Sequence, residues 1–437
     1  MDARTLLLAA AALLAGAAGP VPIDPADFPD PPMAEVRLGQ LLFYDPILSG
    51  NRNISCASCH HPRFATGDGL SLGVGEGGIG LGPARRADPA NTPEQRVPRN
   101  APPLFNLGHS AITTLFADGR IEADTTRASG FRTPLEDEMV AGFSGILSAQ
   151  TMFPVLSPDE MAGHYQENDV AKAVRQGRLT GDGGAWDIIA RRVAAIPAYR
   201  ARLGDAYPEI GAGRSVGFAD ISNAIAAFMA HEWRADDSPF DRYLRDGTPL
   251  PPDAAEGMAL FFGDAGCGTC HSGPLLSDQS FYAMAAPQLG PGKAERFESH
   301  RRDTGRMRVT GRDADAYAFR TPMLRNVTLT GPWGHAGGHT DLRGFLADHA
   351  DPATGLARYR PSAVLPRIAG LGPDWTILDD PGERAAIARA AKTPSRRLTG
   401  PELDRLMAFL SALTDAASLT GRLGIPATVP SGLPVER

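Results

Sequence analysis

The sequence is 437 residues long and has the composition of an ordinary globular protein, with 43% hydrophobic and 21% charged residues. Its formal net charge is −7 and it has no basic cluster, which argues against nucleic acid as a partner. At roughly 150 residues per domain, this length predicts two or three domains with ample hydrophobic core. After Pro20 no apolar run reaches the roughly eighteen residues of a membrane span, so we expect no stable membrane insertion of the mature chain.

Residues 1–19 have the pattern of a cleavable secretory signal. Arg4 precedes an apolar run from Leu6 to Leu14, and small residues follow as far as Gly19. The apolar run is too short to cross a bilayer, although a membrane-tethering helix is the alternative interpretation. Prolines follow at once and favour cleavage, so we expect an exported mature protein.

All four cysteines occur in two Cys-x-x-Cys-His motifs. Four cysteines in an exported protein would normally form two disulfides, but a histidine directly after each pair is the signature of c-type haem attachment. A zinc site or a redox-active cysteine pair would leave both histidines unexplained. Two covalently bound haems are therefore predicted, one on Cys56 and Cys59 with His60 as iron ligand, the other on Cys267 and Cys270 with His271.

An internal repeat surrounds these motifs. Gly39–Phe43 precedes the first motif and Gly257–Phe261 precedes the second, each within an amphipathic segment that predicts a helix. Each copy ends with a further amphipathic helix, at residues 221–229 and 403–413. A capping box that begins at Thr399 marks the start of the last helix.

Between the helices the chain is rich in glycine and proline, and strand-like alternation is scarce. We therefore predict an all-α fold of two cytochrome c-like haem domains with long ordered loops. Turn-forming residues at 246–252 place the boundary, so that residues 20–246 form the N-terminal haem domain and residues 247–437 the C-terminal one. Loops longer than about fifteen residues usually carry function or disorder, and here a large cofactor can organise them.

Beyond the haem motifs, the sequence resembles the bacterial di-haem cytochrome c peroxidase superfamily, which includes MauG. The resembling segments are Arg99–Pro102, Asp118–Arg120, Pro158–Met161, Phe319–Val327 and Leu329–His335. The resemblance covers nearly the whole mature chain and implies a periplasmic di-haem enzyme. In this family the N-terminal haem is the peroxidatic one and the C-terminal haem transfers electrons.

The resemblance also implies catalytic residues at the first haem. The family has a Gln and a Glu in the distal pocket, ten residues apart, and Gln150 and Glu160 match this spacing and context. Glu160 would shuttle a proton between the two oxygens of hydrogen peroxide, and Gln150 would orient the peroxide by hydrogen bonding. Without the family, the preferred interpretation would be that Glu160 is a helix-start residue and Gln150 a solvated side chain.

Many of these peroxidases have a distal histidine in the loop before the Asn-Ala-Pro segment, but this chain has no histidine between Pro62 and Gly108. The first iron is therefore expected to keep an open sixth position, as in MauG. His61 adjoins the proximal ligand and His109 lies beyond the loop, so both are interpreted as structural.

At the second haem the family places the sixth ligand fourteen residues after the histidine that here is His335, which selects His349. Ligation by His271 and His349 is thus predicted, in place of the family's methionine or tyrosine. A surface position for His349, beside two aspartates, is the alternative. Other candidate ligands are Met284, Met307 and Met323.

Two further expectations rest on the resemblance. The family has a calcium site between its domains, and Asn100, Thr330 and Pro332 match its ligands, while Arg320 matches a basic residue whose expected partner is a haem propionate. The family's inter-haem tryptophan is replaced by Ala117, so Phe116, another aromatic or direct tunnelling must take its place.

The predicted function is reduction of hydrogen peroxide at the first haem, with electrons supplied through the second. The donor is expected to be a small redox protein (a cytochrome c or a cupredoxin) or a quinol. A MauG-like enzyme that oxidises side chains of a partner protein is the first alternative. A non-catalytic electron-transfer cytochrome is the second.

Overall fold

The computed structural model describes residues 20–293 and 300–437, so the predicted signal peptide at residues 1–19 lies outside the described residues. About 40% of the residues are helical and few lie in strands. Within the described ranges, no helix combines the length and the apolar character that crossing a bilayer would require.

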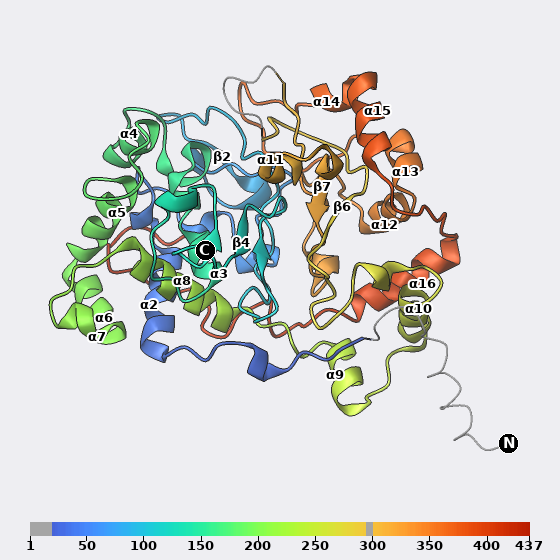
Figure 1. Cartoon of the computed structure of the whole chain (residues 1–437), viewed down its shortest axis with the longest axis horizontal. Coiled ribbons are helices and arrows are strands. Elements are labelled where there is room, and N and C mark those ends of the chain that lie inside the picture. The colour runs from blue at the N-terminus through green and yellow to red at the C-terminus, as the bar shows by residue number, and fades with distance from the viewer. Residues whose placement is uncertain (1–19, 294–299) are drawn as a thin grey trace.

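Helices are distributed along the described part of the chain, from its N-terminal to its C-terminal half (Figure 1). The α-helices are α2 (Met33–Tyr44), α3 (Ile146–Thr151), α4 (Asp169–Arg175), α5 (Ala185–Ala194), α6 (Pro197–Ala206), α7 (Pro208–Gly211), α8 (Phe218–Glu232), α9 (Pro239–Asp246), α10 (Pro252–Phe262), α11 (Met307–Thr310), α12 (Leu342–Ala350), α13 (Pro352–Arg358), α14 (Thr376–Asp379), α15 (Pro381–Ala390) and α16 (Gly400–Ser411).

The strands form small antiparallel sheets, each strand two or three residues long. They are β1 (Gly78–Ile79) with β2 (Arg86–Ala87), then β3 (Thr114–Leu115), β4 (Ile121–Ala123) and β5 (Phe131–Arg132), and finally β6 (Phe281–Ala283) with β7 (Ala318–Arg320). The predicted helical class is confirmed in its main part. Strands this short contain too few residues for the alternation that identifies a strand in a sequence, so the sheets were missed.

The internal repeat corresponds to two helix pairs, α2 with α8 and α10 with α16. In each pair a glycine of the opening helix faces the backbone of the closing helix. A Cβ atom on Gly39 would lie 1.8 Å from the carbonyl oxygen of Ala224, and one on Gly257 would lie 1.9 Å from that of Arg405. Only glycine permits this approach. The capping box predicted at Thr399 is confirmed at the start of α16.

Each helix pair builds its own hydrophobic core. Leu42, Phe43 and Phe228 lie in the first core, and Phe261 and Phe409 lie in the second. Both cores contact one cysteine of the neighbouring haem motif. The two haem motifs therefore each lie against a separate helix pair.

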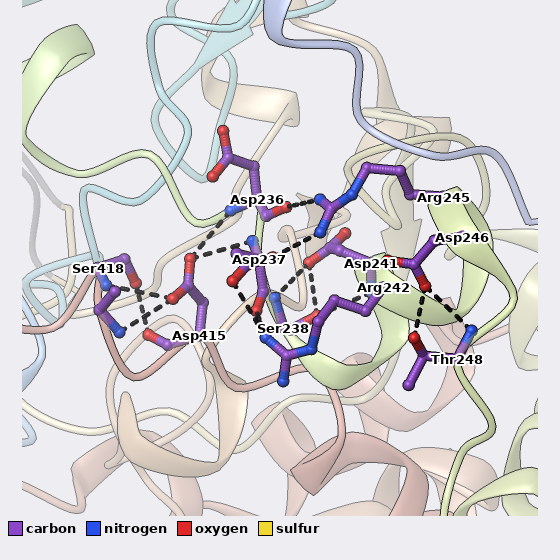
Figure 2. A network of polar contacts seen from close by, with 11 residues as sticks. Asp236, Asp237, Ser238, Asp241, Arg242, Arg245, Asp246, Thr248, Asp415 and Ser418 are labelled. Atoms are coloured by element: carbon purple, nitrogen blue, oxygen red, sulfur yellow. Dashed lines mark hydrogen bonds and ion pairs between the residues drawn. The ribbon is translucent and has the colours of Figure 1, made fainter.

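The link between the two cores runs from the end of α8 to α9. Trp233 and Ala235 belong to the first core, and Phe240 on α9 belongs to the second, so α9 packs with the C-terminal half although the predicted boundary at 246/247 follows it. Figure 2 shows how the link is held: the carboxylate of Asp415 accepts hydrogen bonds from the backbone N–H groups of Asp236 and Asp237, at 3.1 and 3.2 Å.

Residues after α16 return to the N-terminal half, where the C-terminal label lies beside α3 and α8 in Figure 1. Leu433 and Val435 pack against the first core. The hydroxyl of Ser431 donates to Asp45 at 2.6 Å, and Ser58, inside the first haem motif, donates to Glu436. The chain thus begins and ends its folded course against the same core.

Candidate haem sites

The first haem motif forms a tight turn that follows the core helix α2 and the short 3-10 turn Pro46–Leu48. Cys56–Ser58 is a single 3-10 turn, and the N–H of His60 donates to the carbonyl of Cys56 at 2.9 Å. The Nδ1 atom of His60 lies 3.1 Å from the carbonyl of Thr66, which leaves Nε2 as the ring nitrogen available to a metal. Burial lowers the pKa of His60, which favours the neutral ring that ligation requires.

The second motif repeats this geometry. Cys267–Thr269 is a 3-10 turn, the N–H of His271 donates to the carbonyl of Cys267 at 3.0 Å, and its Nδ1 lies 3.0 Å from the carbonyl of Leu276. Burial lowers the pKa of this histidine too. All four cysteines carry free thiols rather than disulfides. Each motif thus offers two thiols and one imidazole whose Nδ1 is held by a backbone carbonyl, and this set of groups fits a covalently attached haem.

His349 lies on α12 and faces His271. Their ring centroids are 6.2 Å apart, with 51° between the ring planes. With metal–nitrogen bonds of about 2 Å on each side, two imidazoles that share one metal have centroids about 6 Å apart. Burial, reinforced by the charge that His271 would carry, lowers the pKa of His349 to about 4. Neighbouring Asp348 pairs with Arg358 at 2.8 Å, whereas the ring of His349 lies beside that of Phe345, with centroids 5.4 Å apart.

The remaining methionine and histidine candidates make contacts of other kinds. Met323 packs against the first core. His61 caps the next turn by accepting from the N–H of Arg63 at 3.1 Å, and Nε2 of His109 lies 3.6 Å from Asp27. The Nε2 atom of each of these two histidines is buried without a hydrogen-bond partner among the described residues, so their structural role stays a prediction.

Gln150 and Glu160 come from two short helical segments on the N-terminal half. Gln150 is half-buried near the end of α3, and Glu160 is half-buried in a single π-helical turn, Pro158–Ala162. Such turns often occur at functional sites. In the part of the chain that the structure describes, neither side chain has a hydrogen-bond partner. Both polar ends are thus available to a ligand.

The charges around Glu160 include one that the sequence did not indicate. Burial raises the pKa of Glu160, while the positive charges of Lys293 and Arg120 oppose that rise. Burial and the nearby arginines lower the pKa of Lys293 to about 8. Lys293 follows Glu160 by more than a hundred residues in a glycine-rich loop, so no local pattern could have linked the two.

The region between the halves is held by a buried ion-pair cluster. Arg99 binds Asp303 through two nitrogens, at 2.7 and 2.8 Å, and Asp118 through the third, at 2.8 Å. Nearby, the rings of Phe319 and His335 stack with centroids 3.9 Å apart. The sequence marked the segments that contain Arg99 and Asp118, but their partner Asp303 carried no signal.

Arg320 and Ala117 are adjacent across this region. The N–H of Arg320 donates to the carbonyl of Ala117 at 2.8 Å, and its Nε donates to that of Phe116 at 3.3 Å. One further nitrogen of Arg320, Nη1, is buried without a hydrogen-bond partner among the described residues. An unpaired guanidinium nitrogen suits an anionic oxygen such as a haem propionate. Phe116, one of the aromatic residues considered as a replacement for the inter-haem tryptophan, stacks with Arg120, whose guanidinium carbon lies 3.9 Å from the centroid of the phenyl ring.

The residues predicted for calcium lie on two loops that touch. The N–H of Asn100 donates to the carbonyl of His335 at 2.9 Å, a few residues from Thr330 and Pro332. The side-chain amide of Asn100 is directed to the carbonyl oxygens of Leu70 and Ser71, at 2.6 and 3.3 Å. The loops are brought together, and calcium binding there stays a prediction.

Comparison with known proteins identifies the family of this chain. A family model described as di-haem cytochrome c peroxidase matches residues 33–248. The methylamine utilization protein MauG of Methylorubrum extorquens is 30% identical over 319 residues, which cover 72% of this chain and 68% of that protein. The chain belongs to the di-haem cytochrome c peroxidase family.

Other members of the di-haem cytochrome c peroxidase family show similar agreement. The cytochrome c551 peroxidases of Nitrosomonas europaea and Pseudomonas aeruginosa are 29% and 28% identical and cover 74% and 75% of this chain, with the same shares of their own lengths. The di-haem peroxidase BthA of Burkholderia thailandensis has the same fold, with a TM-score of 0.59 at 22% identity over 95% of this chain and 94% of its own. The chain is therefore an oxidoreductase, and its family membership implies two c-type haems.

Proposed function

We propose that this protein reduces hydrogen peroxide at the haem attached to Cys56 and Cys59, in the periplasm. Electrons would come from a small redox protein or a quinol through the second haem, whose iron is held by His271 and His349. The proposal rests mainly on Glu160, a carboxylate on the N-terminal half whose side chain is free of hydrogen bonds within the described residues.

The chemistry assigns a separate task to each distal side chain. A haem iron, when bound at His60, supplies the electrophilic centre and the redox equivalents for peroxide reduction. Glu160 accepts a proton from one peroxide oxygen and returns it to the oxygen that leaves as water. Gln150 donates a hydrogen bond to the peroxide and holds it in place. The raised pKa of Glu160 suits a group that must both take up and release a proton.

Steady-state assays of peroxide consumption test this assignment. Reduced cytochrome c, a cupredoxin and a quinol are supplied in turn to the holoprotein. With a competent donor, Glu160→Gln is expected to lower kcat/KM for peroxide by about 10²- to 10⁴-fold, because the proton shuttle is lost. The matched variant Glu138→Gln, at an exposed carboxylate, should keep wild-type activity. Equal activity of Glu160→Gln and wild type, or no activity with any donor, would contradict the proposal.

The second candidate is oxidation of side chains on a partner protein. It is favoured by the 30% identity to MauG and by the lack of a histidine between Pro62 and Gly108, where many of the family's peroxidases have their distal histidine. Peroxide is added to the holoprotein together with co-expressed candidate partners, and mass spectrometry then searches those partners for oxidised residues. Finding no peroxide-dependent modification would eliminate this candidate.

A further inference from the structure

A group of amide side chains converges on Glu76, outside the residues assigned to haem. Nδ2 of Asn51, Asn53 and Asn91 lies 2.8, 2.7 and 2.8 Å from Oε1 of this glutamate. Glu76 is only 1% exposed and lies in the glycine-rich loop that precedes β1. The asparagines come from two other loops and lie nearer the surface, so Glu76 forms the base of the group.

The contacts of Glu76 are unevenly divided between its two oxygens. All three amides meet Oε1, whereas Oε2 is buried and has no hydrogen-bond partner. A carboxylate offers about four acceptor positions, two on each oxygen, so neutral amides alone would be expected to use both oxygens. Across residues 20–293 and 300–437, moreover, no arginine, lysine or histidine forms an ion pair with Glu76. A buried charge without a counterion is costly.

More oxygen-bearing groups surround the same asparagines. Asn51 lies 2.7 Å from a carboxylate oxygen of Glu167 and accepts a hydrogen bond from Asn168 at 2.8 Å. Gly163 leaves space for the side chains of Asn51, Glu167 and Asn168. A Cβ atom at this glycine would lie only 2.8 to 2.9 Å from their polar atoms. An amide presents either its nitrogen or its oxygen when it turns by half a rotation, so the asparagines can direct oxygens inward.

We infer that Glu76, together with the side-chain oxygens of Asn51, Asn53 and Asn91, binds a calcium ion. Ca²⁺ takes six to eight oxygen ligands in flexible geometry, and carboxylate and asparagine oxygens from loops, completed by water, are typical of its sites. Mg²⁺ requires stricter octahedral geometry and retains its waters, which this loop-built set does not favour. The site is separate from the inter-domain position marked by Asn100.

The proposed calcium ion lies between the first haem motif and the turn that carries Glu160. Asn51 and Asn53 lie a few residues before Cys56, and the N–H of Glu76 donates to the carbonyl of Asp159, next to Glu160, at 3.0 Å. A Cβ on Gly75 would lie 2.6 Å from the carbonyl oxygen of Glu160, so the loop of Glu76 packs directly on this segment. The ion therefore ties the first haem motif to the turn that carries Glu160.

The number and affinity of calcium ions bound by the holoprotein test the inference. Wild type, Glu76→Gln and Asn100→Ala are freed of calcium with a chelator and then titrated with CaCl₂ by calorimetry, with bound metal counted by mass spectrometry. Wild type is expected to bind one ion that Glu76→Gln either loses or binds at least tenfold more weakly. Asn100→Ala should keep that ion, since it alters only the other predicted site.

A second variant guards against misfolding of Glu76→Gln. Asn91→Asp adds a negative oxygen ligand, so it should bind the same ion more tightly than wild type and show a larger calcium-dependent rise in Tm. Haem content, measured without calcium, confirms that each variant is folded. The inference is overturned if wild type binds no calcium at this site, or if Glu76→Gln and Asn91→Asp both bind with wild-type stoichiometry and affinity.

Discussion

At the scale of single residues, each haem motif depends on one backbone carbonyl that orients a histidine. Thr66 and Leu276 hold the Nδ1 atoms of His60 and His271, so that Nε2 is presented in both motifs. Such outer contacts fix the tautomer and the ring orientation of a metal ligand. The difference between the motifs then comes from the opposite side, where His349 faces His271 and no histidine of the described chain faces His60.

Exchange of His349 tests this difference. In His349→Met the second haem is expected to acquire His–Met ligation, which raises its potential by on the order of 0.1 V within the roughly 0.8 V that axial ligands span. Redox titration and optical spectra of the oxidised protein measure the change. The matched His231→Met, on α8 in the other half, should leave both haems unaltered. An unchanged second haem in His349→Met would show that His349 is not the ligand.

Lys293 provides a residue-level prediction about pH. Activity that needs the Glu160 carboxylate rises with pH through the pKa of that group. Removing the positive charge in Lys293→Met disfavours the ionised form, so the pKa of Glu160 rises and the acid limb of kcat/KM moves to higher pH. Lys392→Met, at an exposed lysine, is the control. An acid limb that stays at the wild-type pH in Lys293→Met would disprove this coupling.

At the scale of elements, the two helix pairs are the frames on which the haem motifs are mounted. Gly39 and Gly257 let each opening helix approach the backbone of its closing helix, and the aromatic residues that follow fill the cores. Because each motif begins within about a dozen residues of its glycine-containing helix, a displaced helix would displace the motif with it. The internal repeat is thus a repeat of packing as well as of sequence.

Gly257→Ala tests the packing of the second pair. The added methyl group would meet the backbone of Arg405, which cannot move aside, so α10 and α16 must separate. Overpacking of this kind costs about 1–3 kcal/mol or more, and we expect a Tm several degrees lower. Gly400→Ala is the matched control, because its Cβ would lie 3.7 Å from the nearest atom, in ordinary contact. Equal Tm values for the two variants would refute the close approach.

At the scale of the whole molecule, two features join the halves. The first is the cluster of Arg99, Asp118 and Asp303, which links a loop of the N-terminal half to one of the C-terminal half. The second is the segment after α16, which returns to the first core and contacts Ser58 of the first haem motif. The halves are therefore not independent units, and the first haem motif depends on residues from the far end of the chain.

Asp303→Asn tests the ion-pair cluster. Breaking a buried pair on one side typically costs about 3–5 kcal/mol, so the variant should have a clearly lower Tm at pH 7. Asp313→Asn, at an exposed position, should melt like wild type.

The pH dependence gives a second readout of the same cluster. Burial alone would raise the pKa of Asp303, but Arg99 outweighs burial and lowers it. The pair therefore adds stability above the unfolded-state pKa of about 3.9, and this stability is lost as pH falls toward the folded-state value. Thermal unfolding between about pH 5 and pH 2 should show a steeper loss for wild type than for Asp303→Asn. Parallel curves would mean that the pair adds no stability.

The sequence by itself determined the two attachment motifs, the helix pairs around them and the family, because these depend on residues close together in the chain. Cys-x-x-Cys-His spacing, helical periodicity and the capping box at Thr399 are all local patterns, and the structure retains them. The short strands and the packing of α9 on the second core were not predictable in this way.

What only the tertiary structure decided is which distant groups meet. Lys293 lies among the charges that act on Glu160, Asp303 pairs with Arg99, and His349 faces His271 across separate loops and helices. His349 was suggested by its spacing in a known family, whereas Lys293, Asp303 and the asparagines around Glu76 had no such guide. The reason is physical: electrostatic and ligand contacts act through space between loops, and loops carry no periodic pattern from which their neighbours can be predicted.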